Sequence, residues 1–213
     1  ISDRISITSF LEDSAGHTWF GGRGFAYRYD GKQFTHFNFS QGLIAYGSEK
    51  APLTAMTEDS SGRIWFGMYG GNISVFDGKS FTHYTAKQGT EGRFVPALAK
   101  DRHGNTWYNI IDPNINGPSL FRFDGKRIEG FFMRKKAFNI GQFDYIKEDR
   151  SGGIWFAGWG GAVFFDGKEF IRFGKQQGLA GNVVRQIIED KHGNILLATD
   201  GGLSVIRKNK RDS

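Results

Sequence analysis

The sequence contains no cysteine among its 213 residues. A disulfide framework, a thiolate metal site and a thiol nucleophile are therefore all excluded. It also lacks any run of about 20 apolar residues, the length that a membrane-spanning helix requires. The chain begins at Ile1 without a start methionine or a signal peptide, so we expect a processed or trimmed N-terminus.

Methionine and proline are scarce, with 3 and 4 residues, whereas glycine and phenylalanine are abundant, with 31 and 21. Aromatic residues make up 15% of the chain. Aromatic side chains favour strands, and glycine favours the tight turns that join short strands. The composition therefore predicts an all-β protein.

The formal net charge is +6, and half of this excess comes from the C-terminal segment 207–213. Elsewhere lysine and arginine are scattered singly through turns such as Asp-Gly-Lys. A nucleic-acid interface would instead gather basic residues with exposed aromatic residues on one face. We therefore expect a solvated basic surface and no nucleic-acid partner.

One motif recurs five times along the chain. Each copy opens with an aspartate, and glycine follows three residues later and tryptophan six residues later, with Leu196 in place of tryptophan in the fifth copy. The opening residues are Asp13, Asp59, Asp101, Asp149 and Asp190, so successive copies begin 46, 42, 48 and 41 residues apart. A period of about 40 to 50 residues is typical of propeller blades.

The second copy shows how one repeat is expected to fold. Its apolar runs predict strands at 53–57, 64–68, 73–76 and 80–85, with an Asp-Gly turn at 77–78. Asp-Gly between apolar runs indicates a hairpin, because the turn needs a positive φ that glycine adopts without steric cost. A four-stranded sheet cannot bury both faces alone, so the copies must stack, with tryptophan and phenylalanine between the sheets. We predict a β-propeller, with a linear solenoid as the alternative.

We expect a single propeller domain over 1–213, ending in a basic tail at 207–213. Its blades lie approximately at 7–38, 53–85, 96–132, 144–174 and 185–206. The fifth copy has only three predicted strands, which leaves an unpaired edge. Residues 1–6 could supply the closing strand. We favour a closed five-bladed ring, and the alternative is that the chain forms one part of a larger propeller.

The aligned copies give the pattern Ile-x-Glu-Asp-x-x-Gly-x-Ile-Trp-Phe-Gly, followed by Gly-Gly-x-x-x-Phe-Asp-Gly-Lys-x-Phe-Thr. It is clearest at 56–82 and 146–173. This pattern resembles the two-component regulator propeller repeat and is similar to the repeats of streptogramin lyase propellers. The resemblance implies a periplasmic or secreted bacterial protein, commonly the sensor part of a hybrid histidine kinase that detects oligosaccharides. Such sensors generally carry two seven-bladed propellers, an immunoglobulin-like domain, a membrane helix and a kinase, and of these parts this sequence shows propeller repeats alone.

The two tight turns of each copy hardly change, and strand order places both on one face of the disc. The remaining connections vary in length and lie on the opposite face, where binding residues tend to accumulate. Four residues after each blade tryptophan position stand Arg23, Tyr69, Ile111, Trp159 and Asp200. Aromatic platforms beside charged groups suit a pocket for sugars or small peptides. The alternative is that these are ordinary exposed loop residues.

Further residues on or beside the links between blades complete the predicted rim: Tyr46, Arg93, Phe94, Phe143 and Tyr145. The third copy also contains Asp112, Asn114 and Asn116, spaced like the opening of a calcium-binding loop. Leu120 and Phe123 stand where later ligands would be required, so we expect an exposed loop, no metal and no cofactor, with calcium as a weak alternative.

The sequence offers little for catalysis. His17, His103 and His192 fall in the tight turns, and His36 and His83 occupy equivalent places in outermost strands. The repeated tryptophans are expected in the core between blades, and the opening aspartates are expected to stabilise their turns. We therefore predict a non-enzymatic extracytoplasmic ligand-binding or sensor module. The alternatives are a protein-interaction or assembly scaffold and a streptogramin lyase-like enzyme.

Overall fold

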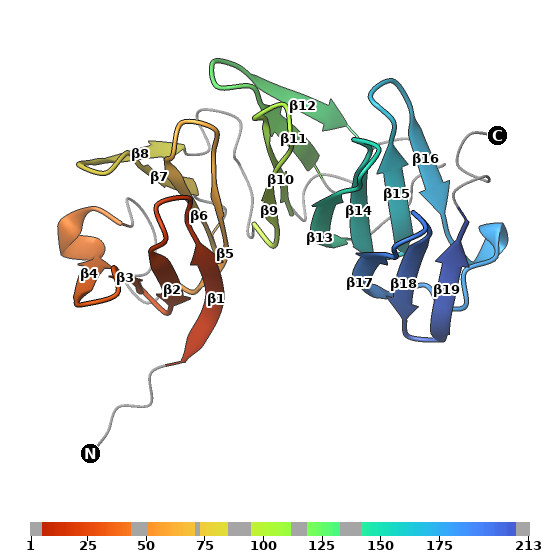
Figure 1. The fold of residues 1–213 in the computed structure, drawn as a ribbon, viewed down its shortest axis with the longest axis horizontal. Helices are drawn as coiled ribbons and strands as arrows, with labels where there is room; N and C mark the ends of the chain where they lie inside the picture. Colours follow the sequence, from red (N-terminus) through yellow and green to blue (C-terminus); the bar gives the residue numbers. More distant parts are fainter. Residues whose placement is uncertain are drawn as a thin grey trace.

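The computed structural model describes residues 6–43, 51–70, 73–84, 95–111, 119–132 and 142–207. These residues form five antiparallel sheets, four with four strands and one with three. The prediction of an all-β fold is confirmed. Figure 1 shows the sheets following one another along an arc, with the first strand of each sheet towards the inside and the last towards the outside.

Each sheet corresponds to one copy of the repeat and is called a blade here. Blade 1 contains β1 (Ile7–Glu12), β2 (Thr18–Gly22), β3 (Phe25–Tyr29) and β4 (Phe34–Asn38). Blade 2 contains β5 (Leu53–Glu58), β6 (Ile64–Met68), β7 (Ile73–Phe76) and β8 (Phe81–Tyr84). Blade 3 contains β9 (Leu98–Lys100), β10 (Thr106–Ile110), β11 (Ser119–Phe123) and β12 (Ile128–Phe132).

Blade 4 contains β13 (Gln142–Glu148), β14 (Ile154–Trp159), β15 (Gly161–Phe165) and β16 (Phe170–Phe173). Blade 5 contains β17 (Val184–Glu189), β18 (Ile195–Thr199) and β19 (Gly202–Ile206). Two short 3-10 helices, η1 (Phe39–Gln41) and η3 (Lys175–Gln177), follow the last strands of blades 1 and 4. In the described part of the chain, no helix has the length and apolar character needed to cross a membrane.

The opening aspartate of each blade organises the turn between the first two strands. In blade 2, Asp59 Oδ1 accepts hydrogen bonds from the backbone N–H groups of Ser61 at 2.9 Å and Arg63 at 3.0 Å. Gly62 takes a positive φ of 77° at the end of this turn. Asp59 Oδ2 accepts a further bond from Trp65 Nε1 at 2.9 Å. The predicted turn-stabilising role is confirmed, and the aspartate also ties the turn to the buried tryptophan.

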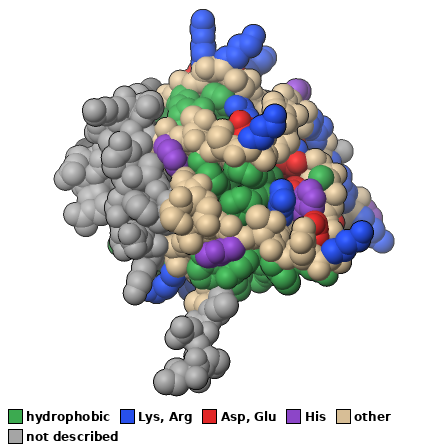
Figure 2. Space-filling view, turned by 90° about the vertical axis from the view of Figure 1, so that its left-hand side faces the viewer, with side chains coloured by type: hydrophobic (Ala, Val, Ile, Leu, Met, Phe, Trp, Pro, Cys, Tyr) green, Lys and Arg blue, Asp and Glu red, His purple; other side chains and the backbone are tan. Residues whose placement is uncertain are grey.

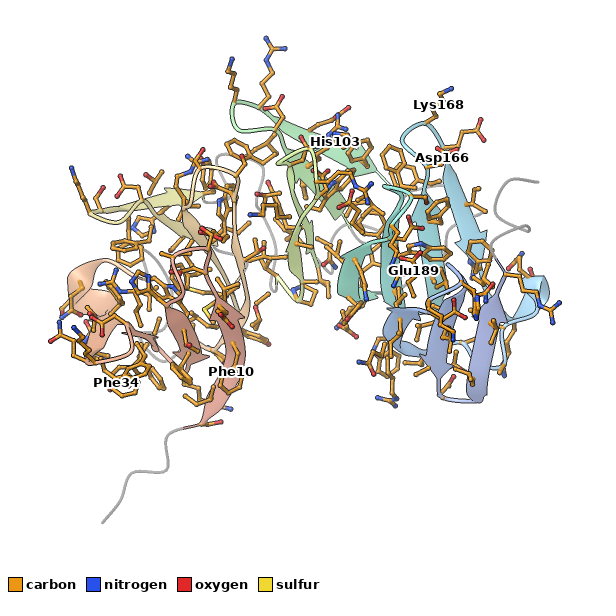
Figure 3. The ribbon with its side chains drawn as sticks, in the orientation of Figure 1. Phe10, Phe34, His103, Asp166, Lys168 and Glu189 are labelled. Atoms are coloured by element: carbon orange, nitrogen blue, oxygen red, sulfur yellow. The ribbon has the colours of Figure 1, made fainter. Side chains whose placement is uncertain are left out.

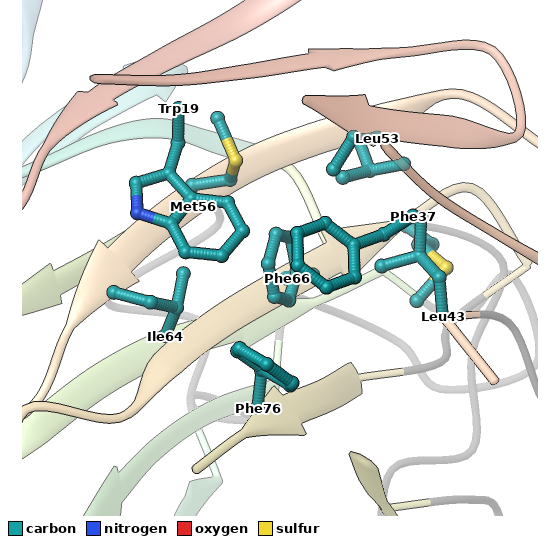
Figure 4. Close-up of a cluster of buried hydrophobic side chains, with 10 residues drawn as sticks. Trp19, Phe37, Leu43, Leu53, Met56, Ile64, Phe66 and Phe76 are labelled. Carbon is teal, nitrogen blue, oxygen red and sulfur yellow. The ribbon is translucent and has the colours of Figure 1, made fainter. Parts of the chain in front are cut away.

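The core lies between neighbouring blades. The tryptophans of blades 1 to 4 are at most 2% exposed, which confirms their predicted place between blades. Trp19 of blade 1 packs edge-on against Phe66 and Phe76 of blade 2, with ring centroids 5.6 and 6.1 Å apart. Figure 4 shows this cluster, with Met56 and Ile64 beside the indole ring and Leu53 at the other side of the cluster, near Phe37. Stacking of blades therefore buries the apolar surface that a single sheet would expose.

The innermost strands pack in chain order: β1 on β5, β5 on β9, β9 on β13 and β13 on β17. Among the described residues, no comparable packing joins blade 5 to blade 1, and the two blades lie at opposite ends of the arc in Figure 1. The predicted closed five-bladed ring is therefore not observed, because four blade-to-blade steps do not bring blade 5 back to blade 1. The predicted closing strand falls on residues 1–5, outside the described residues, and on Ser6. Within the described strands β19 pairs only with β18.

Candidate ligand-binding site

Successive connections of an antiparallel blade alternate between its two ends. The turns between the first and second strands and between the third and fourth strands lie on one side, called the turn face. The connections between the second and third strands, and the links between blades, lie on the other side, called the loop face. Arg23, Tyr69 and Asp200 lie in the connections between second and third strands, and Trp159 is the last residue of the second strand β14, so all four lie at the loop face.

Arg23 and Tyr69 are brought together by one short segment at the start of blade 2. Arg23 forms an isolated β-bridge with Pro52, and the following Gly24 donates its N–H to the Ala51 carbonyl at 3.0 Å. The Tyr69 N–H donates to the Pro52 carbonyl, also at 3.0 Å. Both side chains are exposed, Tyr69 to 57%. The loop face therefore presents a fixed aromatic residue near a fixed arginine.

Trp159 and Asp200 are brought together in the same way at the start of blade 5. Trp159 forms an isolated β-bridge with Val183, and Gly160 donates its N–H to the Asn182 carbonyl at 2.8 Å. The Asp200 N–H donates to the Val183 carbonyl at 3.0 Å. Trp159 is 58% exposed. A second aromatic residue thus stands near a charged residue, and blade 3 separates this pair from the first along the arc.

One oxygen of the Asp200 carboxylate already accepts a backbone hydrogen bond. Its Oδ1 accepts the Val183 N–H at 3.0 Å. This hydrogen bond lowers the pKa of Asp200 below its ordinary value, since it favours the charged form. Asp200 is therefore an anion at neutral pH, opposite in sign to Arg23.

Phe143 does not belong to the predicted rim. It is fully buried and packs against Phe156, with ring centroids 5.6 Å apart. A ligand on the surface cannot reach this side chain, so we remove it from the site. The sequence held a signal for this burial, because the residues six positions before the opening aspartates of the other four blades are all apolar: Ile7, Leu53, Val95 and Val184. The last three of these are buried.

Two other rim residues of the sequence analysis are partly buried. Tyr145 packs against the Trp155 cluster, and Ile111 is only partly exposed after β10. The remaining candidates lie outside the described residues: Tyr46, Arg93, Phe94, Asp112, Asn114 and Asn116. In the parts of the chain that the structure describes, no group of three or more histidine, aspartate or glutamate residues could hold a metal ion.

The turn face carries many charged groups, and its aspartates are already hydrogen-bonded to the scaffold. A hollow of about 360 Å³ between blades 3 and 4 is lined by residues that include Asp101, His103 and Asp166. Asp101 accepts four hydrogen bonds, from His103 N–H, Asn105 N–H, Asn105 Nδ2 and Trp107 Nε1. Asp166 accepts the N–H groups of Lys168 and Glu169 within its own turn, and Figure 3 shows it beside Lys168 at the upper edge of the molecule. We therefore keep the loop face as the candidate site.

Residues 178–201, which include β17, β18 and Asp200, match a family described as "Two component regulator propeller". The repeat predicted from the sequence is confirmed. No curated protein has a sequence that matches this chain.

Solved structures share the fold at low sequence identity. An extracellular domain assigned to a hybrid two component system of B. thetaiotaomicron matches with a TM-score of 0.77 and 18% identity over 97% of this chain and 28% of that chain. Virginiamycin B lyase from Staphylococcus aureus gives 0.68 and 12% over 97% and 72% of the two chains. PorZ, a surface component of the type-IX secretion system of Porphyromonas gingivalis, gives 0.67 and 14% over 95% and 32%. These similarities establish the β-propeller fold, and the chain spans less than a third of the first of these proteins.

Proposed function

We propose that this chain is a non-enzymatic extracytoplasmic sensor propeller that binds an oligosaccharide or another small polar ligand on its loop face. One observation carries the proposal. Tyr69 and Trp159 expose more than half of their side-chain surface, and each is held by backbone hydrogen bonds beside a charged residue. An exposed aromatic ring can stack on the apolar face of a sugar, while Arg23 and Asp200 can hydrogen-bond to its hydroxyl groups.

The comparisons support an extracytoplasmic sensor. The matched family is a two-component regulator propeller, and one similar structure is an extracellular domain of a two component system. A propeller in such a system would report on a ligand outside the cytoplasm, in the periplasm or in the medium. No cofactor is required for this function, because binding by stacking and hydrogen bonds uses the side chains of the chain alone.

Thermal unfolding tests the proposal. Anything that binds only the folded state raises the unfolding midpoint by mass action. We expect a concentration-dependent rise with one class among neutral oligosaccharides, sulfated oligosaccharides and short peptides. Trp159→Ala or Tyr69→Ala should abolish the rise, whereas Phe10→Ala, which removes an exposed aromatic ring within β1 and not in a loop, should preserve it. Adding calcium in place of an organic ligand tests the alternative that the chain binds this metal. No rise with any ligand would contradict the proposal.

A lyase activity is the alternative that the comparison with virginiamycin B lyase raises. The lyase structure is that of a variant made inactive by replacing one histidine with alanine. In this chain His17, His103 and His192 lie in turns of the turn face, and His36 and His83 lie in β4 and β8. None of the five stands on the loop face, so we expect quinupristin to remain intact, by mass spectrometry, after incubation with the protein.

A further inference from the structure

The hollow between blades 3 and 4 on the turn face plays no part in the proposed loop-face site. Its volume of about 360 Å³ falls within the range of small-ligand pockets. Both blades contribute to its lining, and Figure 3 shows His103 of blade 3 and Asp166 of blade 4 on the same upper side of the molecule. Five lining residues define its chemistry: Asp101, Asn105 and Trp107 of blade 3, and Phe165 and Asp166 of blade 4.

The interface between blades 2 and 3 repeats this set of residues with one difference. Four of the five places in the repeat hold the same residue types there: Asp59, Trp65, Phe123 and Asp124. The fifth place lies four residues after the opening aspartate. Blade 3 carries Asn105 at this place, whereas blade 2 carries Arg63. The two interfaces therefore differ by one side chain of the set, and that side chain is charged in one of them.

Arg63 shows which chemical group this place accepts. Its Nε donates to Asp59 Oδ2 at 2.7 Å. Its guanidinium carbon lies 5.6 Å from the centroid of the Phe123 ring. A carboxylate and an aromatic face are the two groups that a guanidinium pairs with and stacks on in proteins. In the interface between blades 2 and 3, the chain thus supplies its own guanidinium.

The interface between blades 3 and 4 lacks that group. Asn105 has a shorter side chain, and its Nδ2 donates to Asp101 Oδ2 at 2.8 Å. Within the described residues, no arginine or lysine lies over the ring of Phe165, the counterpart of Phe123. The hollow is therefore lined by the counterparts of the residues that hold the Arg63 guanidinium one interface earlier.

The two arginines in the lining of the hollow already have acidic partners. Arg102 Nε lies 2.6 Å from Glu148 Oε1, and Arg122 Nη2 lies 2.5 Å from Glu129 Oε2. The Arg122 guanidinium also lies over the Trp107 ring, 5.6 Å from its centroid. Their positive charges are balanced locally, so they do not set the charge of the hollow.

The aspartates of the lining have no such partners. Asp101 is 6% exposed, and its four hydrogen bonds come from two backbone N–H groups, an amide and an indole, all uncharged. Asp166 accepts two backbone N–H groups. Neither takes part in a salt bridge within the described residues. On the side where blades 1 and 2 lie, by contrast, Figure 2 shows acidic side chains next to lysine, arginine or histidine. The hollow is therefore bordered by negative charge without a cation, which favours a cationic occupant.

Two oxygen atoms at the hollow remain open to a hydrogen-bond donor. Both bonds to Asp166 end at its Oδ1, and the Asn105 amide uses its nitrogen for Asp101. Asp166 Oδ2 and Asn105 Oδ1 thus accept no hydrogen bond within the described residues. A guanidinium carries five N–H donors in one plane and no acceptor, and its flat face stacks on aromatic rings. It matches the two open acceptors and the Phe165 ring together.

We propose that the turn-face hollow between blades 3 and 4 binds the guanidinium group of an arginine side chain from a partner polypeptide. The group stacks on Phe165, its N–H groups donate to Asp166 Oδ2 and Asn105 Oδ1, and Asp101 supplies a second negative charge. This site lies on the face opposite the loop-face site, so it goes beyond the proposed function and is occupied independently of it.

Nuclear magnetic resonance of the indole N–H groups tests the site with controls inside the same molecule. Of the five tryptophans, Trp107 lines the hollow. The probe is Nα-acetyl-arginine amide, and Nα-acetyl-citrulline amide is a probe of the same shape without the charge. We expect the arginine probe to shift the Trp107 signal in a saturable way and to leave the signals of Trp19, Trp65 and Trp155 unchanged. The citrulline probe should shift none of them.

Two pairs of variants locate the bound probe. Asn105→Arg supplies the hollow with a guanidinium of the chain, as Arg63 does between blades 2 and 3, and should abolish the shift. Asn194→Arg, the same change at the equivalent place of blade 5, should preserve it. Asp166→Asn should weaken binding about tenfold, because a hydrogen bond to a charged group is lost. Asp124→Asn, its counterpart beside Arg63, should leave the affinity unchanged.

Three results would each overturn the site in the hollow. They are no saturable shift of Trp107 with the arginine probe, an equal shift with the citrulline probe, or undiminished binding in Asn105→Arg or in Asp166→Asn. Asp166 lies in an exposed turn, so its variant remains a test even if circular dichroism shows that Asn105→Arg is unfolded. Any of these results would leave the loop-face proposal standing, because that proposal depends on Tyr69 and Trp159.

Discussion

The opening aspartate of a blade makes more hydrogen bonds to the scaffold than its place in a surface turn suggests. Asp59 accepts two backbone N–H groups, the Arg63 Nε and the Trp65 Nε1, so one side chain fixes the turn, a surface arginine and the core indole. Burial alone would raise the pKa of Asp59, but the hydrogen bonds from Trp65, Arg63 and Ser61 outweigh it and lower that pKa. The folded chain therefore holds Asp59 as a stabilised anion.

Replacing this carboxylate tests its structural role. We expect Asp59→Ala to lower the free energy of unfolding by about 3 kcal/mol, because it leaves the buried Trp65 Nε1 without a partner and frees the turn. Asp166→Ala, at an exposed Asp-Gly-Lys turn, should cost much less, because that carboxylate holds no buried partner. Urea denaturation measures both values. Equal losses would show that the bond to tryptophan contributes nothing.

The lowered aspartate pKa values predict a loss of stability in acid. Asp13, Asp59 and Asp190 have folded-state pKa values below the ordinary 3.8. Their contribution is fully present above the unfolded-state value and is lost as the pH falls from there through the folded-state values. The unfolding midpoint should therefore fall below about pH 4, and it should fall less steeply in Asp59→Asn. A midpoint that rises on acidification would refute this account.

At the scale of strands and turns, the repeat could be predicted from the sequence, because each residue pattern that marks it forms a structure within a few residues of itself. The Asp-Gly-Lys turns bind their own backbone through the aspartate, as Asp77 does to Lys79 and Ser80. The place of Phe143 was only partly predictable: the equivalent position is apolar in the other blades, but an aromatic residue next to a link also suits a rim. Packing against Phe156 of the same blade decides the matter, and packing is a property of the assembled sheets.

Two aromatic residues of blade 4 should differ in how much their loss lowers the free energy of unfolding, because one is buried and the other is exposed. Phe143→Ala should lower the free energy of unfolding by about 4 kcal/mol, because it opens a cavity in the core. Trp159→Ala should change it by less than about 0.5 kcal/mol, since the ring is mostly in solvent. Chemical denaturation of both variants checks this contrast. A large loss from Trp159→Ala would mean that the indole is part of the scaffold, and its role as a binding platform would fall with it.

At the scale of the whole molecule, the number of blades could be predicted but their closure could not. Blade number follows from a repeat that each copy carries in its own residues. Closure depends on the rotation between successive blades. Packing of large side chains such as Trp19 and Phe66 sets this rotation, and no motif in the sequence specifies it. The loop face was predictable from the alternation of connections, whereas the pairing of its residues around Pro52 and Val183 was not.

Tryptophan fluorescence tests ligand binding on the loop face most directly. The chain has five tryptophans, of which four are buried and only Trp159 is exposed, so added quencher reports chiefly on Trp159. Titration with the ligand that raises the unfolding midpoint should protect the exposed tryptophan from acrylamide in a saturable way, and Trp159→Phe should remove that signal while leaving the buried emission unchanged. Unaltered quenching at saturating ligand, or the same response in Trp159→Phe, would contradict binding at this face.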